Sequence, residues 1–313
     1  MNPRIQKNCG AVLSSAQDRF AALTKQPLKA VGTGNGAALG TWTSIKAVVA
    51  HREVLALMVR RDLKARYKDS ALGMVWTLIR PLTQLFIYYI VMGKFLGAER
   101  GIPDFAIYVF TGLTVYGLLS EIVSGGTSSI VGNGGLIKKI YLPREVFPLA
   151  SVGSALFNFC IQMGVLLVAL FAVGHPSLHM GLLYFFPALA IIVIYGTAFA
   201  LLLSATNVYL RDVQYLVDVI LLILLWASPI VYSWEMAKNI MGEGILLSLY
   251  TNSPITLAVL GFQQAFWVGG APAAQFPAEL MLRMLIALVV GLVLLFGFHR
   301  VFARLQGNFA QEL

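Results

Sequence analysis

Charged residues are scarce in this sequence. They make up 12% of the 313 residues, whereas 58% are hydrophobic, and soluble domains carry about 25% charge. A soluble core this apolar would leave too little polar surface to face water, so the apolar excess is expected to face lipid. The composition therefore predicts an integral membrane protein.

Residues that carry chemistry are equally scarce. The only two cysteines, Cys9 and Cys160, fall in a predicted tail and a predicted span, so no disulfide is expected. The four histidines are scattered, without an H-E-x-x-H motif or paired C-x-x-C motifs, so no metal site is predicted. No G-x-x-x-x-G-K-[ST] loop and no catalytic constellation occur. We therefore expect a chain that is not an enzyme and has no cofactor of its own. If it moves a substrate uphill, the energy must come from a partner or from an ion gradient.

Basic residues are unevenly distributed. The net charge is +9, and twelve of the 23 Lys and Arg residues lie before Ser70. Such a chain could bind nucleic acid, but basic residues beside apolar runs are typical of the positive-inside rule. The sequence therefore predicts membrane lipids, and not nucleic acid, around these residues.

The N-terminal part reads as two segments. Residues 1–50 hold no apolar run long enough for a signal peptide and are predicted to be a cytosolic tail, partly disordered. Residues 51–71 are predicted to form an amphipathic helix, with Leu55, Val59 and Leu63 on one face. Its basic face is expected to lie on anionic headgroups, although an ordinary soluble helix is the alternative.

Residues 72–313 are predicted to be a transmembrane domain of about six helices, giving an all-α fold. Each predicted span is near the roughly 20 residues that cross the hydrocarbon. The predicted spans are Leu72–Leu96, Phe105–Val123, Leu149–Val173, Leu182–Val208, Val213–Tyr232 and Leu280–Phe302.

The stretch Ile245–Val268 is ambiguous. Asn252-Ser253-Pro254 interrupts it, and a proline at mid-depth would leave backbone groups unpaired in lipid. We expect a pair of short re-entrant helices before the last span, with a seventh span as the alternative.

Loop charges predict the orientation. One side holds the basic N-terminal segment, Lys138, Lys139, Arg144, Arg211, Arg300 and Arg304, and the other side holds fewer cations. The positive-inside rule then places both termini in the cytosol. Glu121 and Asp218 are expected near the cytosolic ends of their spans, where they could bond cytosolic loops.

Aromatic residues cluster in the first, second and fifth spans. Tyr and Trp give flat apolar faces with a polar edge, which suits sugar rings in a channel, but they also form the ordinary aromatic belt of membrane proteins. The candidates for lining a channel are Phe86, Tyr88, Tyr89, Tyr108, Tyr116, Trp226, Tyr232 and Trp234.

Four segments together resemble one known family, the permease subunits of ABC-2-type polysaccharide exporters, which carry O-antigen, teichoic acid, capsule or galactan. The segments are RDLKARYKDSALGMVW (61–76, running on to Pro81-Leu82), LIKKIYLP (136–143, closed by Pro148), NVYLRDV (207–213), and SPIVY (228–232) followed by NSP (252–254). Their order and spacing match over roughly Arg52 to the C-terminus.

The resemblance implies a homodimer around a central channel in the bacterial cytoplasmic membrane, with two copies of an ABC nucleotide-binding subunit that bind ATP and Mg. The implied cargo is a glycan linked to polyprenyl diphosphate, and the Ile245–Val268 pair would form an outer gate. The implied gate-helix residues are Arg60, Arg61, Lys64, Arg66 and Tyr67. The implied ATPase-docking residues are Leu136, Ile137, Lys138, Lys139, Tyr141, Arg144, Glu145, Arg211 and Asp212.

Three other functions stay open from the sequence. An ABC-2 permease for a drug or lipid would have the same architecture. An ion-coupled secondary transporter predicts inverted repeats and a midplane ion site, and neither is evident. A membrane glycosyltransferase predicts an acidic metal-binding loop, whereas the cytosolic loops here are short and basic.

Overall fold

The computed structural model describes residues 46, 48–67, 76–95, 97, 102–139, 142–173, 179–267 and 275–313. The chain divides into two compact units, Met1–Trp42 and Thr43–Leu313, and the architecture below is that of the second. The residues described form helices, turns and bends without any β-strand, so the predicted all-α class is confirmed. The predicted tail lies outside the described residues except for its last few positions.

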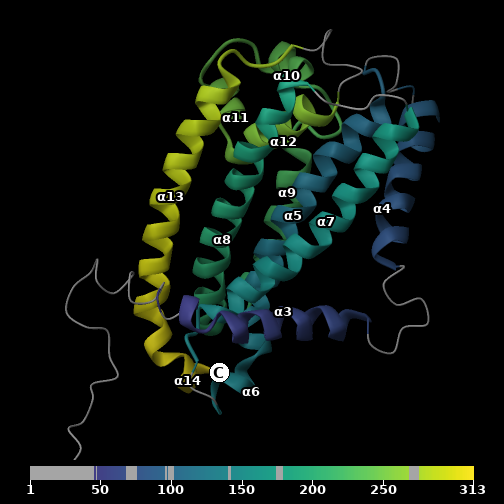
Figure 1. Cartoon of the computed structure of the whole chain (residues 1–313). Helices are drawn as coiled ribbons and strands as arrows, with labels where there is room; N and C mark the ends of the chain where they lie inside the picture. Colours follow the sequence, from purple (N-terminus) through teal and green to yellow (C-terminus); the bar gives the residue numbers. More distant parts are fainter. Residues whose placement is uncertain are drawn as a thin grey trace, which may run out of the picture. The chain divides into compact units, whose positions relative to one another are not determined.

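Long apolar helices form the body of this unit (Figure 1). They are α5 (Phe105–Gly132), α7 (Val146–Val173), α8 (Phe185–Tyr209) and α13 (Leu280–Leu305). Within the described residues, these four are long and apolar enough to cross a membrane, and a bent helix pair would make five. They overlap the second, third, fourth and last predicted spans.

The first and fifth predicted spans correspond to shorter elements. α4 (Trp76–Ile87) continues directly into the π-helix η2 (Tyr88–Phe95). α9 (Val213–Trp226) has 14 residues and so is roughly 21 Å long, which is less than the hydrocarbon core of about 30 Å. It ends before the predicted Tyr232, because the chain turns at Ser228–Ile230 around Pro229.

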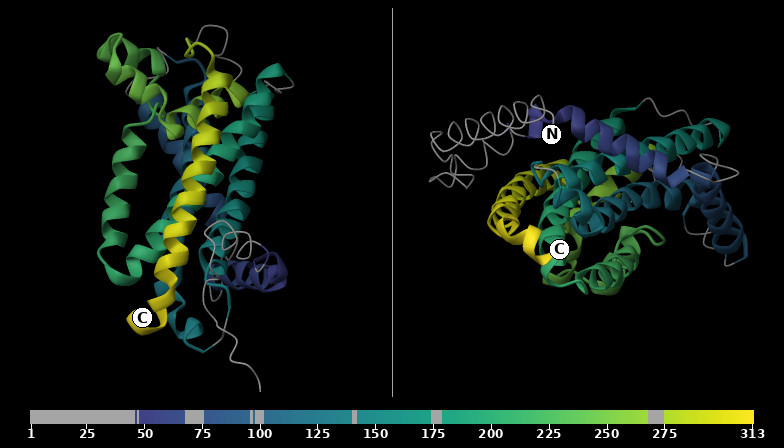
Figure 2. Two further views of the ribbon diagram at one scale, coloured as in Figure 1. Left: turned by 90° about the vertical axis from the view of Figure 1, so that its left-hand side faces the viewer. Right: turned by 90° about the horizontal axis from the view of Figure 1, so that it is seen from below.

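The chain passes back and forth between the two ends of the bundle. α4 with η2, α5, α7, α8, α9 and α13 run alternately away from and toward the end that holds α3 (Arg52–Tyr67), as Figures 1 and 2 show. The predicted arrangement of about six spans therefore describes the path of the chain, although the first and fifth are not single long helices.

The predicted break before the last span is present. α11 (Ile245–Thr251) and α12 (Pro254–Phe266) meet at an angle of 63°, and Pro254 is the first residue of α12. α9 runs toward the end that holds α10 (Trp234–Met241), and α13 starts at that same end (Figure 1). The pair therefore enters and leaves at one end, as predicted for re-entrant helices.

α5 is the central helix of the unit. In its most apolar window 78% of the residues are buried, compared with 28% in α7 and 22% in α13. A Cβ atom on Gly126 would lie 2.4 Å from the Cβ of Ala200 in α8. Small residues at this crossing let the two backbones approach closely, which is how helices pack where lipid replaces water.

The Gly126→Ala variant should therefore be destabilised. The added methyl forces α5 and α8 apart, and overpacking of this kind costs about 1–3 kcal/mol. Thermal unfolding in detergent would measure it, with Gly164→Ala on α7 as the matched control, because nothing lies within 4 Å of a Cβ there. Equal melting temperatures for the two variants would contradict the close crossing.

α3 lies across the ends of the long helices (Figures 1 and 2). Met58 is buried, and Leu55, Val59 and Leu63 are partly buried, whereas Arg60 is exposed. Val59 packs so closely on α7 that a Cβ on Gly153 would lie 2.7 Å from its Cγ2. The expected apolar ladder therefore packs on the bundle, and its placement at the membrane interface stays a prediction.

Candidate functional site

One face of the central helix α5 is polar. Gly117, Glu121, Ser124 and Ser128 recur at intervals of three or four residues and so lie on the same side of the helix. All four keep partial or full exposure, whereas most of the other α5 residues are buried. Polar residues inside a membrane helix normally face the bundle interior or water, and they mark functional sites by default.

α7 supplies hydrogen-bond donors to this face. The side-chain amide of Asn158 donates to both carboxylate oxygens of Glu121, at 3.1 and 3.0 Å. The Ser151 hydroxyl donates to a backbone carbonyl oxygen of α5 at 3.1 Å. Gln162 continues the row, because its side-chain oxygen lies 3.5 Å from where a Cβ on Gly117 would be.

α9 supplies the other side. The Gln214 amide donates to the Ser124 hydroxyl at 3.2 Å and to the Asp218 carboxylate at 3.4 Å. The Ser124 hydroxyl donates to the same carboxylate at 3.4 Å. Asp218 is exposed, and the Gln214 side-chain oxygen is a buried atom without a hydrogen-bond partner.

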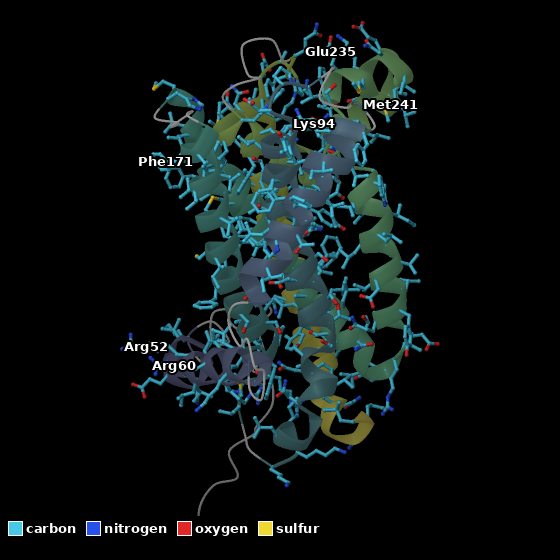
Figure 3. The ribbon with its side chains drawn as sticks, turned by 90° about the vertical axis from the view of Figure 1, so that its right-hand side faces the viewer. Arg52, Arg60, Lys94, Phe171, Glu235 and Met241 are labelled. Atoms are coloured by element: carbon cyan, nitrogen blue, oxygen red, sulfur yellow. The ribbon has the colours of Figure 1, made fainter. Side chains whose placement is uncertain are left out.

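We call this set the polar seam: Gly117, Glu121, Ser124 and Ser128 of α5, Ser151, Asn158 and Gln162 of α7, and Gln214 and Asp218 of α9. In Figure 3, α7 and α9, which contribute to the seam, lie on opposite sides of the view. Placing an acidic side chain in hydrocarbon costs about 2.5–3.5 kcal/mol on insertion scales. The hydrogen bonds to Glu121 and to Asp218 offset part of that cost. The seam therefore offers carboxylates, amides and hydroxyls in a region where a membrane protein is otherwise apolar.

The expected position of Glu121 near the end of its helix was wrong. α5 continues to Gly132, so Glu121 lies well inside it and bonds Asn158 of α7. Asp218 likewise bonds Ser124 and Gln214, which lie on helices, and not a cytosolic loop.

Three of the predicted channel aromatics are exposed. Phe86 of α4, Tyr89 of η2 and Trp226 of α9 are 63%, 44% and 57% exposed. Tyr88 is partly buried and packs against the main core. The exposed rings belong to three elements that flank α5 and are available to contact a substrate, lipid or a second copy.

Three others are buried inside the unit. The Tyr108 hydroxyl donates to the backbone oxygens of Pro229 and Tyr232, at 3.0 and 2.8 Å. Tyr116 is buried too, and its hydroxyl donates to the backbone oxygen of Leu221 in α9. The Trp234 indole donates to Thr251 at 2.9 Å. In this conformation these rings hold helices together and have little surface for a passing molecule.

Tyr232 belongs to a network around the turn after α9. Its hydroxyl donates to the backbone oxygen of Trp226 at 3.1 Å and accepts from the Tyr250 hydroxyl at 3.3 Å. The Gln263 amide donates to the backbone oxygen of Pro229 at 2.8 Å. The network ties the turn at Ser228–Ile230 to the re-entrant pair.

The predicted gate-helix cations lie on α3. Arg60, Arg61 and Lys64 are exposed, and Figure 3 shows Arg60 projecting at the α3 end. The Arg61 guanidinium bonds Asp62 at 2.7 Å and Asn133, which follows α5, at 2.8 Å. The side chains of Arg66 and Tyr67 lie outside the described residues.

The predicted docking residues divide into exposed and buried sets. Lys138, Lys139, Arg211 and Asp212 are exposed, and Leu136 and Arg144 are partly buried. Ile137, on the short helix α6 (Gly134–Ile137), and Glu145 are buried. The apolar face of α6 packs on the unit itself, so the exposed charged residues are the ones available to a partner. Tyr141 lies outside the described residues.

The family model described as ABC-2 type transporter matches residues 53–267. The chain belongs to this family. It is also 28% identical to the O-antigen export system permease protein RfbA of Myxococcus xanthus over 271 residues, which are 86% of this chain and 98% of that protein. A second similar protein is the O-antigen export system permease protein RfbA of Klebsiella pneumoniae, at 26% identity over 263 residues, 83% of this chain and 95% of the relative.

Family membership settles two points about this ABC-2 permease. It is a multi-pass membrane protein and a non-catalytic transport component. ABC-2 permeases work with ABC ATPase subunits, which decides between ATP and an ion gradient as the energy source. The ion-coupled and glycosyltransferase alternatives are therefore dropped.

Most of the polar seam of the permease was missed from the sequence. A signal was present, because Gly117, Glu121, Ser124 and Ser128 share a helical face, as do Ser151, Asn158 and Gln162. The pattern was missed because small polar residues lower the local hydropathy, which was read as the end of the apolar span although the helix continues.

Proposed function

We propose that this ABC-2 permease is the transmembrane subunit of an ATP-driven exporter of polysaccharide linked to polyprenyl diphosphate. Two copies assemble with two copies of an ABC ATPase subunit, which binds ATP and Mg; this chain binds neither. The proposal is supported by similarity to O-antigen export permeases over most of the chain.

The polar seam is the observation that carries the choice of cargo. A glycan is covered with hydroxyls, and each hydroxyl that enters the membrane without a partner costs free energy. The seam offers both acceptors, at Glu121 and Asp218, and amide donors, at Asn158, Gln162 and Gln214. A purely apolar drug or lipid would gain nothing from such a row.

Exposed aromatic rings complement the seam. Phe86, Tyr89 and Trp226 lie on elements that contact α5, and aromatic faces suit the apolar faces of sugar rings. In a homodimer with the two seams facing each other, hydroxyl-binding residues line the path and these rings flank it.

Charge distribution supports the proposed orientation in the bacterial cytoplasmic membrane. Figure 3 shows Arg52 and Arg60 at one end and Lys94 at the other. The elements at the α3 end also carry Arg61, Lys64, Lys138, Lys139, Arg144, Arg211, Arg300 and Arg304. We place that end and both termini in the cytosol, following the positive-inside rule.

The two cytosolic loops give the proposal its mechanism. Lys138, Lys139, Arg211 and Asp212 contact the ATPase, α3 lies at the cytosolic entrance, and the re-entrant pair closes the outer end. Binding and release of ATP in the partner rock the two permease copies against each other and advance the glycan stepwise.

An export assay in the native host tests the proposal. Deleting the permease should remove the glycan from the cell surface and leave the lipid-linked glycan accumulated on the cytosolic side of the membrane. The wild-type chain should restore export, and a Walker-motif variant of the co-purified ATPase should not. Unchanged surface glycan together with a co-purified ATPase would instead favour the drug or lipid permease.

A further inference from the structure

The C-terminal segment after α13 folds back onto the α3 end of the unit. It comprises η5 (Gln306–Asn308) and α14 (Phe309–Glu312), visible beside α6 in Figure 1. Phe309 is fully buried, and its ring lies 5.7 Å from that of Phe302 and 6.3 Å from that of Tyr209. Phe309 therefore belongs to a small buried cluster at this end of the unit, together with Phe302, Val146 and Phe147.

The segment contacts the loop between α5 and α7. The Arg144 guanidinium carbon lies 5.6 Å from the centre of the Phe309 ring. Gln306 approaches the buried carboxylate of Glu145, with 3.5 Å between Nε2 and Oε1. The Leu313 side chain lies 3.5 Å from where a Cβ on Gly134 would be, so the chain end reaches α6.

It also contacts the last residue of α8, next to the loop between α8 and α9. The Tyr209 hydroxyl donates to the backbone oxygen of Leu305 at 2.9 Å, and its ring packs edge-on against Phe309. His299 of α13 lies beside this junction, with 3.8 Å between its Nε2 and the Glu145 carboxylate. We call Leu305–Leu313 the C-terminal clamp.

The loop between α5 and α7 and the C-terminal end of α8 converge on the clamp. Arg144 and Glu145 of the α5–α7 loop contact Phe309 and Gln306 of the clamp, and Asn133 of that loop bonds Arg61 of α3. Tyr209 contacts Leu305 and Phe309. Phe309 is the shared point, because Arg144 of the α5–α7 loop and Tyr209, which directly precedes the α8–α9 loop, both contact its ring.

We infer that the C-terminal clamp holds the two cytosolic loops in a fixed arrangement that the ATPase subunit binds as one surface, with Phe309 as the positioning residue. The inference rests on the proposed function, in which both loops dock on the ATPase. Two docking points on one rigid unit bind more tightly than two that move independently, because the second contact forms without further loss of freedom.

ATPase binding to the full-length permease in lipid nanodiscs tests the clamp. The Phe309→Ala variant should bind the ATPase roughly tenfold more weakly. This loss is smaller than the increase in affinity that linking two binding sites can give. Phe309→Leu should retain most of the affinity, because it stays apolar and large. Phe298→Ala is the matched control, since Phe298 lies on α13 and contacts Phe199 away from the loops.

A second variant separates loss of the clamp contacts from loss of the fold. Leu313→Ala together with Gln306→Ala changes partly exposed residues of the clamp, and we expect a smaller loss of affinity without a change in melting temperature. Variants that lower the melting temperature but bind the ATPase like wild type would overturn the clamp and leave the proposed function intact. A wild-type permease that binds no ATPase would overturn the proposed docking itself.

Discussion

Replacing Ser124 by tryptophan is expected to reduce glycan export by more than roughly tenfold while leaving the permease folded and bound to its ATPase. Ser124 lies at the centre of the polar seam and bonds Gln214 and Asp218. An indole there adds bulk on the face that we propose the glycan follows, and it displaces hydroxyl-binding groups that a moving chain would use. Surface glycan per cell, normalised to permease in the membrane, measures the effect.

The matched control for this variant is Val293→Trp. Val293 lies on α13 and is 67% exposed, so the same ring is added to a helix that contributes nothing to the seam. Export by Val293→Trp should stay within about twofold of wild type. Equal export by the two variants would show that the glycan does not pass along the seam. If the Ser124→Trp protein is lost from the membrane, Ser124→Leu, which adds less volume, takes its place in the comparison.

The seam also explains why one helix boundary was predicted wrongly. The sequence indicated that the second span ends near Val123, because hydropathy falls at the following run of Ser, Gly and Thr. α5 nevertheless continues to Gly132. The Thr127 and Ser129 hydroxyls donate to carbonyl oxygens of their own helix, at 2.7 and 2.6 Å, so these polar residues are satisfied locally. Gly126 at the same place gives α8 its close approach.

Hydropathy was a sound guide where apolar runs are unbroken. The predicted span Leu182–Val208 falls within η4 (Met180–Tyr184) and α8, and the predicted span Leu280–Phe302 falls within α13. The break at Pro254 was also predicted, because proline ends a helix for local steric reasons. Such features depend on a single segment and can be derived from it.

Side-chain roles in the candidate site depended on neighbours far away in the chain. Tyr89 and Tyr108 are the same residue type in apolar segments, yet one is 44% exposed and the other 2%. The difference arises because Pro229 and Trp267, more than a hundred residues later, pack against Tyr108. A pattern within one helix cannot show which face a distant segment will cover.

The contrast between these two tyrosines leads to the second large effect. The Tyr108→Phe variant should lose about 1–3 kcal/mol of stability, because it removes the one hydroxyl proton that the carbonyl oxygens of Pro229 and Tyr232 share. Tyr89→Ala should leave stability almost unchanged, since the side chain is exposed, and should instead lower export if its ring contacts sugar. Thermal unfolding in detergent and the export assay together separate the two roles.

Tyr89→Phe is the control for the chemical change itself, because it removes the same hydroxyl from an exposed position. If Tyr108 lined the path with its ring face, Tyr108→Phe would keep that face and would leave both stability and export unchanged. A melting temperature equal to wild type would therefore contradict the structural role assigned to Tyr108. A lowered melting temperature with normal export per folded molecule would instead show that Tyr108 stabilises the turn after α9. Phe86, Tyr89 and Trp226 would then remain as the rings that flank the glycan.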